Sequence, residues 1–221
     1  LKKFNVILAN PPYSIKSWDR KAFDSDSFGR NLWGTPPQGC ADYAFQQHIQ
    51  KSLDVDNGRS ISLWPHGILF RDAETDMRRK MIEEDQVECV IGLGPNLFYN
   101  SPMEACLLIT KTSKEKSKQG KVLIINAVKE VRQDKNIAYL ENNHIERIYN
   151  AYVDYKDIDG FCKVVSIEDV LAHKASLNMA LYVSNVDSSQ EQISLGDALA
   201  SWTESSEKLE NSMEQLFKEL G

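Results

Sequence analysis

The sequence predicts an α/β fold, and three observations lead to that prediction. Short apolar segments of strand length alternate with longer segments whose apolar residues recur at helical spacing. The hydrophobic fraction of 42% and the charged fraction of 26% are ordinary for a globular protein. A chain of 221 residues is long enough for one substantial core, or for one domain with an appendage.

The chain begins with a predicted strand, a long loop and a helix. Residues 4–9 are mostly apolar and end at Asn10-Pro11-Pro12, which predicts a short buried strand. Residues 14–39 are rich in Ser, Asp, Gly and Pro, and loops of this length are usually functional or mobile. The aromatic residues of this loop could order over a base or a cofactor, or could attach the loop to the domain. Residues 41–53 show the apolar spacing of a helix.

The rest of the chain continues the alternation of strands and helices, which favours a largely parallel sheet. The closely spaced strands 105–110 and 122–127 predict an antiparallel hairpin at one edge of that sheet. The elements predicted after the first helix are a strand over 60–64, a helix over 73–84, strands over 87–93, 105–110 and 122–127, a helix over 141–154, a strand and helix up to about 172, and a strand around 181–183.

The predicted domain boundary lies near residue 184. Residues 1–184 are expected to form the domain, and residues 185–221 a polar linker and an acidic amphipathic helix. The net charge of −6 is carried by residues 187–221, which hold eight acidic and two basic side chains. Because the rest of the chain is neutral overall, charge neither supports nor excludes binding to nucleic acid.

The four cysteines are scattered, with neither a C-x-x-C pair nor a histidine at metal-ligand spacing. We therefore expect free thiols in a reducing cytoplasm and no metal site. No apolar stretch approaches the roughly 18 residues that a membrane span needs. The first residues run directly into a strand, so no secretory signal and no membrane partner are expected.

The motif that indicates chemistry is Asn10-Pro11-Pro12-Tyr13, directly after a predicted strand. The exocyclic amino group of adenine is a poor nucleophile because its lone pair is delocalised into the ring. The Asn10 side-chain carbonyl and the Pro11 backbone carbonyl could accept the two amino hydrogens, with the prolines holding the backbone rigid. Tyr13 offers an aromatic face on which an extruded base could stack. The alternative interpretation is a strand-terminating turn with a packed tyrosine.

With this motif the sequence resembles the N6-adenine DNA methyltransferases, whose motif IV is Asp, Asn or Ser followed by Pro-Pro and an aromatic residue. It resembles more closely the modification subunit of type I restriction–modification systems, including the acidic helical tail. Further blocks carry this resemblance in the family's order: residues 4–13, 41–48, 63–71, 90–93, 96–99, 101–108 and 177–183.

The resemblance implies a Rossmann-like methyltransferase domain with a C-terminal helical tail. It implies S-adenosyl-L-methionine as cofactor and the adenine amino group in double-stranded DNA as acceptor. By the same resemblance, Asn10, at the edge of the cofactor site, and Pro11 hold the amino group, while Tyr13 stacks on the flipped base. Asp42 and Phe45 would lie beside the active site. The tail would dock on the specificity subunit of a complex that can also contain a restriction subunit.

One departure from the family pattern matters. A glycine-rich cofactor motif, Phe-x-Gly-x-Gly after a strand, normally precedes motif IV, whereas only nine residues precede Asn10 here. No later glycine completes that pattern. We therefore expect the chain to be the target-adenine part of the catalytic domain, without the cofactor-binding half and inactive on its own.

Two other functions fit part of the pattern. Protein glutamine N5-methyltransferases also use Asn-Pro-Pro-Tyr, because an amide nitrogen is similarly unreactive, but they lack the block at 64–71 and the acidic tail. A non-catalytic fragment that only binds a specificity subunit is the second alternative.

Other polar side chains also admit two interpretations. His48 is expected in the core, and His66 is expected to serve loop geometry rather than a cleft. The basic cluster either contacts phosphate or forms a solvated helix face, and its members are Arg71, Arg78, Arg79 and Lys80.

Overall fold

The computed structural model describes residues 1–98, 101–134 and 137–183, together with 199, 202–206, 208 and 212–213 of the tail. The chain divides into two compact units, Leu1–Asn185 and Val186–Gly221. Tyr99, the predicted linker and most of the predicted acidic helix lie outside the described residues. Within the described part, no helix has the length and apolar character needed to cross a membrane.

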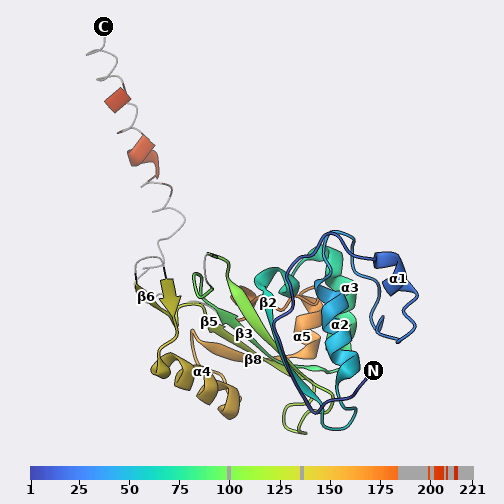
Figure 1. Cartoon of the computed structure of the whole chain (residues 1–221). Coiled ribbons are helices and arrows are strands. Elements are labelled where there is room, and N and C mark those ends of the chain that lie inside the picture. The colour runs from blue at the N-terminus through green and yellow to red at the C-terminus, as the bar shows by residue number, and fades with distance from the viewer. Residues whose placement is uncertain are drawn as a thin grey trace. The chain divides into compact units, whose positions relative to one another are not determined.

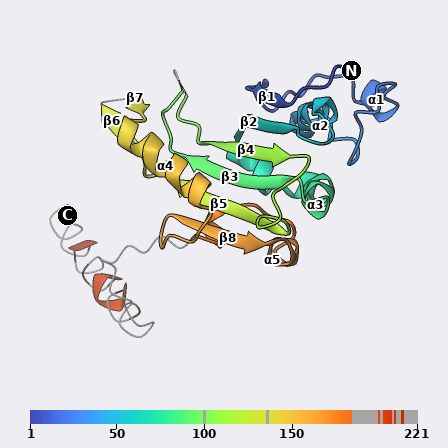
Figure 2. The same ribbon diagram turned by 90° about the horizontal axis from the view of Figure 1, so that it is seen from below.

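The first unit is built on a sheet that Figure 1 shows with its helices, and its six strands follow the order β1-β2-β4-β3-β5-β8 (Figure 2). Its strands are β1 (Val6–Ala9), β2 (Arg59–Pro65), β3 (Val87–Leu93), β4 (Ala105–Lys111), β5 (Lys121–Ala127) and β8 (Cys162–Ser166). A separate two-stranded ladder pairs β6 (Arg132–Asp134) with β7 (Ile137–Tyr139).

Four strands of the large sheet run in one direction, and two run against them. β1 pairs in parallel with β2, and β3 pairs in parallel with β5. β4 is antiparallel to both β2 and β3, and β8 is antiparallel to β5. The carboxyl ends of β1, β2, β3 and β5 therefore meet at one edge of the sheet. The α/β class is as predicted, but the sheet is mixed rather than largely parallel.

The predicted hairpin between the segments that form β4 and β5 is wrong. β3 lies between these two strands, so they do not pair with each other. All seven residues of β3 are buried. A strand with a continuous apolar run is covered on both faces and belongs in the middle of a sheet. The short connection from β4 to β5 instead crosses the end of β3.

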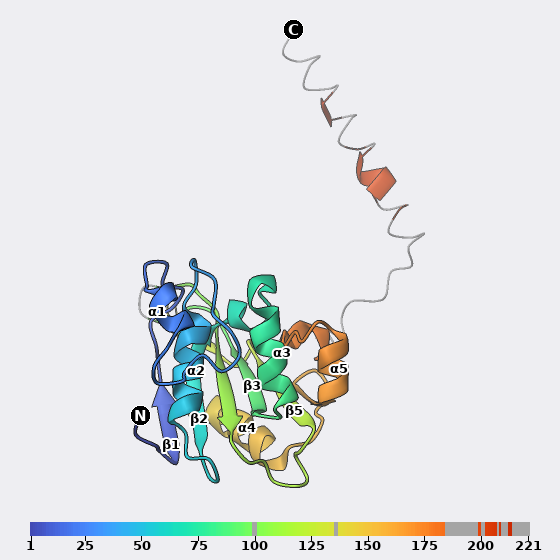
Figure 3. The same ribbon diagram turned by 90° about the vertical axis from the view of Figure 1, so that its right-hand side faces the viewer.

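Helices cover both faces of the sheet. Figure 3 shows α2 (Asp42–Ser52), α3 (Thr75–Glu83) and α5 (Ile167–Ala172) on one face and α4 (Asn142–Asp154) behind the sheet, and Figure 2 shows α4 lying across β3 and β5. Two buried clusters follow from the alternation of side chains along a strand. Val90 packs in the first cluster, whereas its neighbours Cys89 and Ile91 pack in the second, beneath α4.

Two sequence-based predictions of strands need correction. The predicted strand around 181–183 is a turn of 3₁₀ helix, Met179–Leu181, which begins where the Asn178 side chain accepts a hydrogen bond from Ala180 N at 3.2 Å. The predicted buried strand at 4–9 forms as β1, but its Val6 and Leu8 side chains are 50% and 75% exposed. Ile7 and Ala9 pack against the first core cluster, so Val6 and Leu8 point to the opposite face of the sheet, where α4 lies over β3 and β5 rather than over β1.

The long loop 14–39 is held to the domain by two of its aromatic residues. It contains one short helix, α1 (Arg20–Asp24), from which Phe23 is buried. Trp33 is 1% exposed, and its indole Nε1 donates to Glu84 Oε2 at 3.0 Å. Phe28 is 58% exposed. Burial of Phe23 and Trp33 supports attachment of the loop to the domain, one of the two roles considered for its aromatic residues.

Candidate active site

The Asn10–Tyr13 motif forms a turn at the carboxyl end of β1, with the Asn10 side chain exposed. The Tyr13 hydroxyl donates to Asn10 Oδ1 at 2.7 Å, so the turn folds back on itself. Burial raises the pKa of the Tyr13 phenol, and the nearby Cys106 and Asp42 add to the effect. The hydroxyl therefore stays protonated at neutral pH and serves as a donor. The Tyr13 ring is half-buried and packs at the margin of the first core cluster.

Asp42 lies next to this turn, although 28 positions separate it from Ser14. Ser14 N donates to Asp42 Oδ1 at 2.6 Å, directly after Tyr13 in the chain. The second carboxylate oxygen, Oδ2, accepts from the Arg71 guanidinium at 2.8 Å. Asp42 is 0% exposed and opens helix α2, where the helix dipole favours a negative charge.

Arg71 lies at the centre of a cluster that the sequence did not predict. Its NH1 contacts Cys40 Sγ at 2.7 Å, Asp42 Oδ2 at 2.8 Å and Glu74 Oε2 at 3.1 Å. These three side chains have ligand atoms within 4.8 Å of one another, an arrangement that could suit a metal ion. The guanidinium contacts all three, so in this structure the cation of the cluster is an arginine.

The protonation states in this cluster follow from its burial. Burial opposes the charge of Arg71, but the hydrogen bond to Asp42 and the charge of Glu74 outweigh it and raise the Arg71 pKa. Burial raises the pKa of Cys40 to about 12, so this residue is a neutral thiol. Burial also raises the pKa of Glu74, against the opposing effect of the Arg71 charge.

Phe45 lies one turn after the start of α2 and lines an apolar pocket of about 320 Å³ beside the turn. Ile15, Trp18 and Phe23 of the loop and His48 of α2 also line this pocket. His48 is therefore half-buried in a pocket wall rather than in the core, and burial lowers its pKa. Hydrogen bonds thus join Tyr13 to Asn10 and Asp42 to Ser14, directly after the motif, whereas Phe45 lines the pocket beside the following loop.

The remaining polar candidates have structural partners. His66 bridges its turn to β4 through a contact of 2.7 Å between Nε2 and Ala105 O, as its loop role predicts. The basic cluster is neither a phosphate site nor one solvated face, because its members point different ways. Arg78 is 1% exposed and donates to Ala175 O at 2.6 Å. Lys80 Nζ donates to Trp33 O at 3.1 Å.

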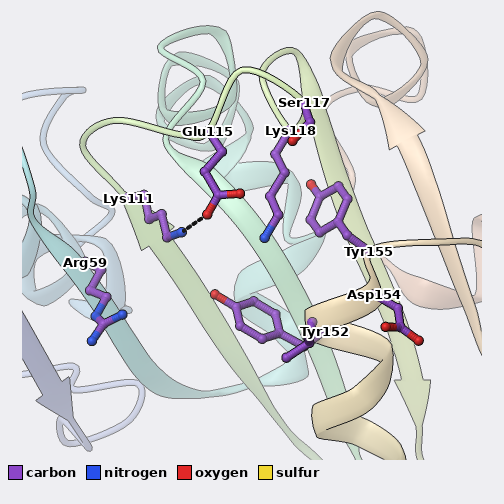
Figure 4. A pocket seen from close by; sticks show the side chains of 9 residues that line it. Arg59, Lys111, Glu115, Ser117, Lys118, Tyr152, Asp154 and Tyr155 are labelled. Carbon is purple, nitrogen blue, oxygen red and sulfur yellow. Dashed lines mark ion pairs between the residues drawn. The ribbon is translucent and has the colours of Figure 1, made fainter.

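A larger pocket, of about 540 Å³, lies at the opposite edge of the sheet (Figure 4). Arg59, the first residue of β2, and Lys111, the last residue of β4, line it with Lys118 and Tyr152. Lys111 and Lys118 each bind the buried Glu88 carboxylate at 3.0 Å. These two lysines are thus already paired with a carboxylate, and the pocket is remote from the carboxyl ends of the parallel strands.

Residues 1–191 match the family model described as N-6 DNA methylase. The chain belongs to the N-6 DNA methylase family. The methylase subunit of the type I restriction enzyme MjaVIII from Methanocaldococcus jannaschii is 32% identical over 88% of this chain and 34% of its own length. The HindI methylase subunit from Haemophilus influenzae is 26% identical, over 91% of this chain and 46% of its own length.

A solved structure extends this similarity to the fold of the N-6 DNA methylase family. The type I restriction–modification system methyltransferase subunit from Streptococcus thermophilus is 35% identical, with a TM-score of 0.76 over 83% of this chain and 39% of its own. The predicted Rossmann-like methyltransferase class is therefore confirmed. The chain spans 34% to 46% of the length of these three relatives.

Proposed function

We propose that this chain carries the target-adenine part of an N6-adenine DNA methyltransferase, the modification subunit of a type I restriction–modification system. The reaction would transfer a methyl group from S-adenosyl-L-methionine to the exocyclic amino group of a flipped adenine. The observation that carries the proposal is the exposed Asn10 amide at the end of β1, with Tyr13 bonded to it at 2.7 Å.

The chemistry of Asn10 suits an amino-group substrate. An amide oxygen has two acceptor positions, and Tyr13 Oη occupies one of them. The other is available to an adenine amino hydrogen, and the Pro11 carbonyl would accept the second hydrogen. These two bonds would favour rehybridisation of the nitrogen and free its lone pair for attack. The ring of Tyr13 would stack on the base and compensate part of the cost of unstacking it.

We infer that the described residues supply only part of a cofactor site. Asn10 would contribute to its edge, but the Gly92-Leu93-Gly94 segment at the carboxyl end of β3 lacks the Phe-x-Gly-x-Gly pattern. We infer that the cofactor-binding half packs against β1. The open backbone edge of β1 and the exposed Val6 and Leu8 side chains support this placement, since an unpaired apolar edge strand is normally covered.

The proposed partners are double-stranded DNA and a specificity subunit, with or without a restriction subunit. In the second unit the described residues include helical positions with exposed apolar side chains, namely Leu199 at 56%, Trp202 at 69% and Met213 at 47%. In the sequence, their spacing of 3 and 11 residues is the spacing expected of one face of a helix, because 3.6 residues make one turn. Such a face supports docking on another subunit.

The two alternatives have less support. The relatives are named as methylase subunits of restriction enzymes, which does not favour a protein glutamine methyltransferase. A purely scaffolding role does not explain an exposed Asn10 bonded to Tyr13 at the end of a parallel strand.

Asn10→Ala in the complete modification subunit tests the proposal. Loss of the amide acceptor should lower methyl transfer to DNA by about 10³-fold, comparable to removing one polar group that stabilises a transition state. Transfer is measured with radiolabelled S-adenosyl-L-methionine, and binding of the cofactor by calorimetry should change little. Asn5→Ala, at the other end of the same strand, is the matched control and should keep full activity. Methylation at the wild-type rate by Asn10→Ala would contradict the proposed mechanism.

A further inference from the structure

We propose that Asp42 is a positioning residue for the adenine site, and that Arg71 and Glu74 hold it in place. The inference rests on the proposed function, because it concerns the geometry of the Asn10–Tyr13 turn. Asp42 would not touch the base. It would instead fix the backbone directly after Tyr13, and thereby fix how Asn10 and Tyr13 are presented.

The turn needs a fixed partner because its backbone is strained. Ser14 has a φ of 50°, in the left-handed region that residues other than glycine rarely adopt. Such a conformation costs about 1–3 kcal/mol and persists only where the surroundings hold it. The bond of 2.6 Å from Ser14 N to Asp42 Oδ1 is the contact that holds it. Without this acceptor, the chain after Tyr13 is free to relax to an ordinary conformation.

Asp42 can act as a rigid acceptor because both of its oxygens are engaged. Oδ1 accepts from Ser14 N, and Oδ2 accepts from Arg71 NH1 at 2.8 Å. A buried carboxylate bonded to a guanidinium forms a charge-assisted hydrogen bond, which is shorter and stronger than a neutral one. The Asp42 side chain is 0% exposed, so water does not compete for either oxygen.

Arg71 is itself held from two sides. Glu74 Oε2 lies 3.1 Å from its NH1, and the side chain folds over Gly67. A Cβ atom at Gly67 would lie 2.6 Å from Arg71 Nε, so a side chain at this position would displace the guanidinium. Glycine at position 67 therefore permits the approach of Arg71. A continuous set of bonds thus leads from Glu74 through Arg71 and Asp42 to the backbone of the catalytic turn.

The expected effect of Asp42→Asn is on the rate of transfer rather than on binding. The amide keeps the volume and one acceptor, but it removes the charge that orients Arg71. Misplacing reacting groups by about 1 Å can cost about 10²-fold in rate. We expect the single-turnover rate constant of the complete subunit in its complex to fall about 10²-fold. The dissociation constants for S-adenosyl-L-methionine and for DNA should change by less than about threefold, or about 0.7 kcal/mol.

Glu88→Gln is the matched control, because it removes an equally buried carboxylate charge at the other edge of the sheet. Its rate constant should stay within about twofold of wild type, a change of about 0.4 kcal/mol. The fluorescence of 2-aminopurine, placed at the adenine that the wild-type complex methylates, reports stacking on Tyr13. Asp42→Asn should alter the bound signal, and Glu88→Gln should leave it unchanged.

Arg71→Lys and Arg71→Met test the same proposal if Asp42→Asn fails to fold. Lysine keeps a charged donor for Asp42, so Arg71→Lys should retain at least tenfold more activity per folded molecule than Arg71→Met, equal to about 1.4 kcal/mol. Equal rates for these two variants, or a rate for Asp42→Asn within threefold of wild type, would overturn the positioning role and leave the proposed function standing. A wild-type complex that transfers no methyl group to adenine would overturn both.

Discussion

Two buried ion clusters lie at opposite edges of the same sheet, and they have similar components. At the carboxyl-end edge, the carboxylates of Asp42 and Glu74 surround the Arg71 guanidinium. At the other edge, Lys111 and Lys118, which line the pocket in Figure 4, both bind the Glu88 carboxylate beneath it. All three carboxylates have fully buried side chains. Burial of charge therefore does not by itself distinguish a candidate active site from a structural one.

The two clusters differ in what they connect. The Arg71 cluster ends on Ser14 N, beside an exposed turn that can meet a substrate. The Glu88 cluster contacts residues that hold the domain together. Tyr155 Oη donates to the backbone oxygen of Glu88 at 3.1 Å, and Lys118 Nζ lies 4.8 Å from the centre of the Tyr155 ring. Glu88 also sits at an irregularity in β3, where the register shifts between Val87 and Cys89. A bulge of this kind re-aims one side chain.

The clusters also differ in which charge can reach water. The lysines of the Glu88 cluster are 17% and 12% exposed, whereas Asp42 and Glu74 have no exposed side-chain surface. Removing the ion that each cluster shares, Arg71 in one and Glu88 in the other, should therefore lower the free energy of unfolding by different amounts. Lysines have flexible side chains that can turn toward solvent. Asp42, at the start of α2, and Glu74, at the end of the 3₁₀ turn Asp72–Glu74, cannot do so.

Arg71→Met should produce the largest loss of stability. It leaves two buried carboxylates without the guanidinium that bonds both of them, and breaking a buried pair in this way costs about 3–5 kcal/mol. Urea denaturation of the complete subunit measures the change in the free energy of unfolding. Glu88→Gln is the comparison and should cost less, about 1–2 kcal/mol, because the amide still accepts hydrogen bonds. Equal losses for the two variants would mean that exposure of the lysines makes no difference.

Glu74→Gln should change how stability depends on pH. Burial raises the Glu74 pKa above its ordinary value of 4.5, so the folded state holds this proton to higher pH than the unfolded state. The stabilising contribution of protonated Glu74 is fully present below pH 4.5 and is lost as pH rises through the folded-state pKa. The free energy of unfolding of wild type, minus that of Glu74→Gln, should fall across this interval. A difference that rises with pH would show that the Arg71 charge, rather than burial, controls Glu74.

The sequence predicted the parts of this site that are local in the chain. Asn10 to Tyr13 are consecutive and follow a strand, so strand and turn patterns place them at a strand end. The link from Asp42 to Arg71 spans 29 positions and depends on the packing of a loop, a helix and a 3₁₀ turn. Hydrophobic periodicity relates only residues that are close together in one helix or strand. From the sequence, Arg71 was therefore grouped with the basic residues that follow it in the chain. Gly67, four positions before Arg71, was the one local indication that the Arg71 side chain approaches the backbone closely.

The difference between local and non-local features also explains the errors in the predicted fold. Helix α4 (Asn142–Asp154) agrees with the predicted 141–154 to within one residue, because its apolar spacing is local. The order of the strands is not local. Short separation in sequence favoured pairing of β4 with β5, yet the fully buried β3 lies between them. The exposure of Val6 and Leu8 in β1 likewise depends on which elements cover that face of the sheet, and the apolar residues of the strand itself do not indicate this.

Tyr13→Phe should give the smallest effect and sharpen the comparison further. The ring remains for stacking, and only the hydrogen bond to Asn10 Oδ1 is lost. A single such bond contributes about 0.5–1.5 kcal/mol, which corresponds to a loss of roughly 2- to 12-fold in the methyl-transfer rate. Tyr155→Phe removes the equivalent hydroxyl bond from the Glu88 cluster, to a backbone oxygen 3.1 Å away. It should lower stability by a similar amount without changing the rate. If Tyr155→Phe slowed transfer as much as Tyr13→Phe, the transfer rate would not distinguish the two clusters. The hydrogen bonds at Ser14 and Asn10 would then no longer identify the active site.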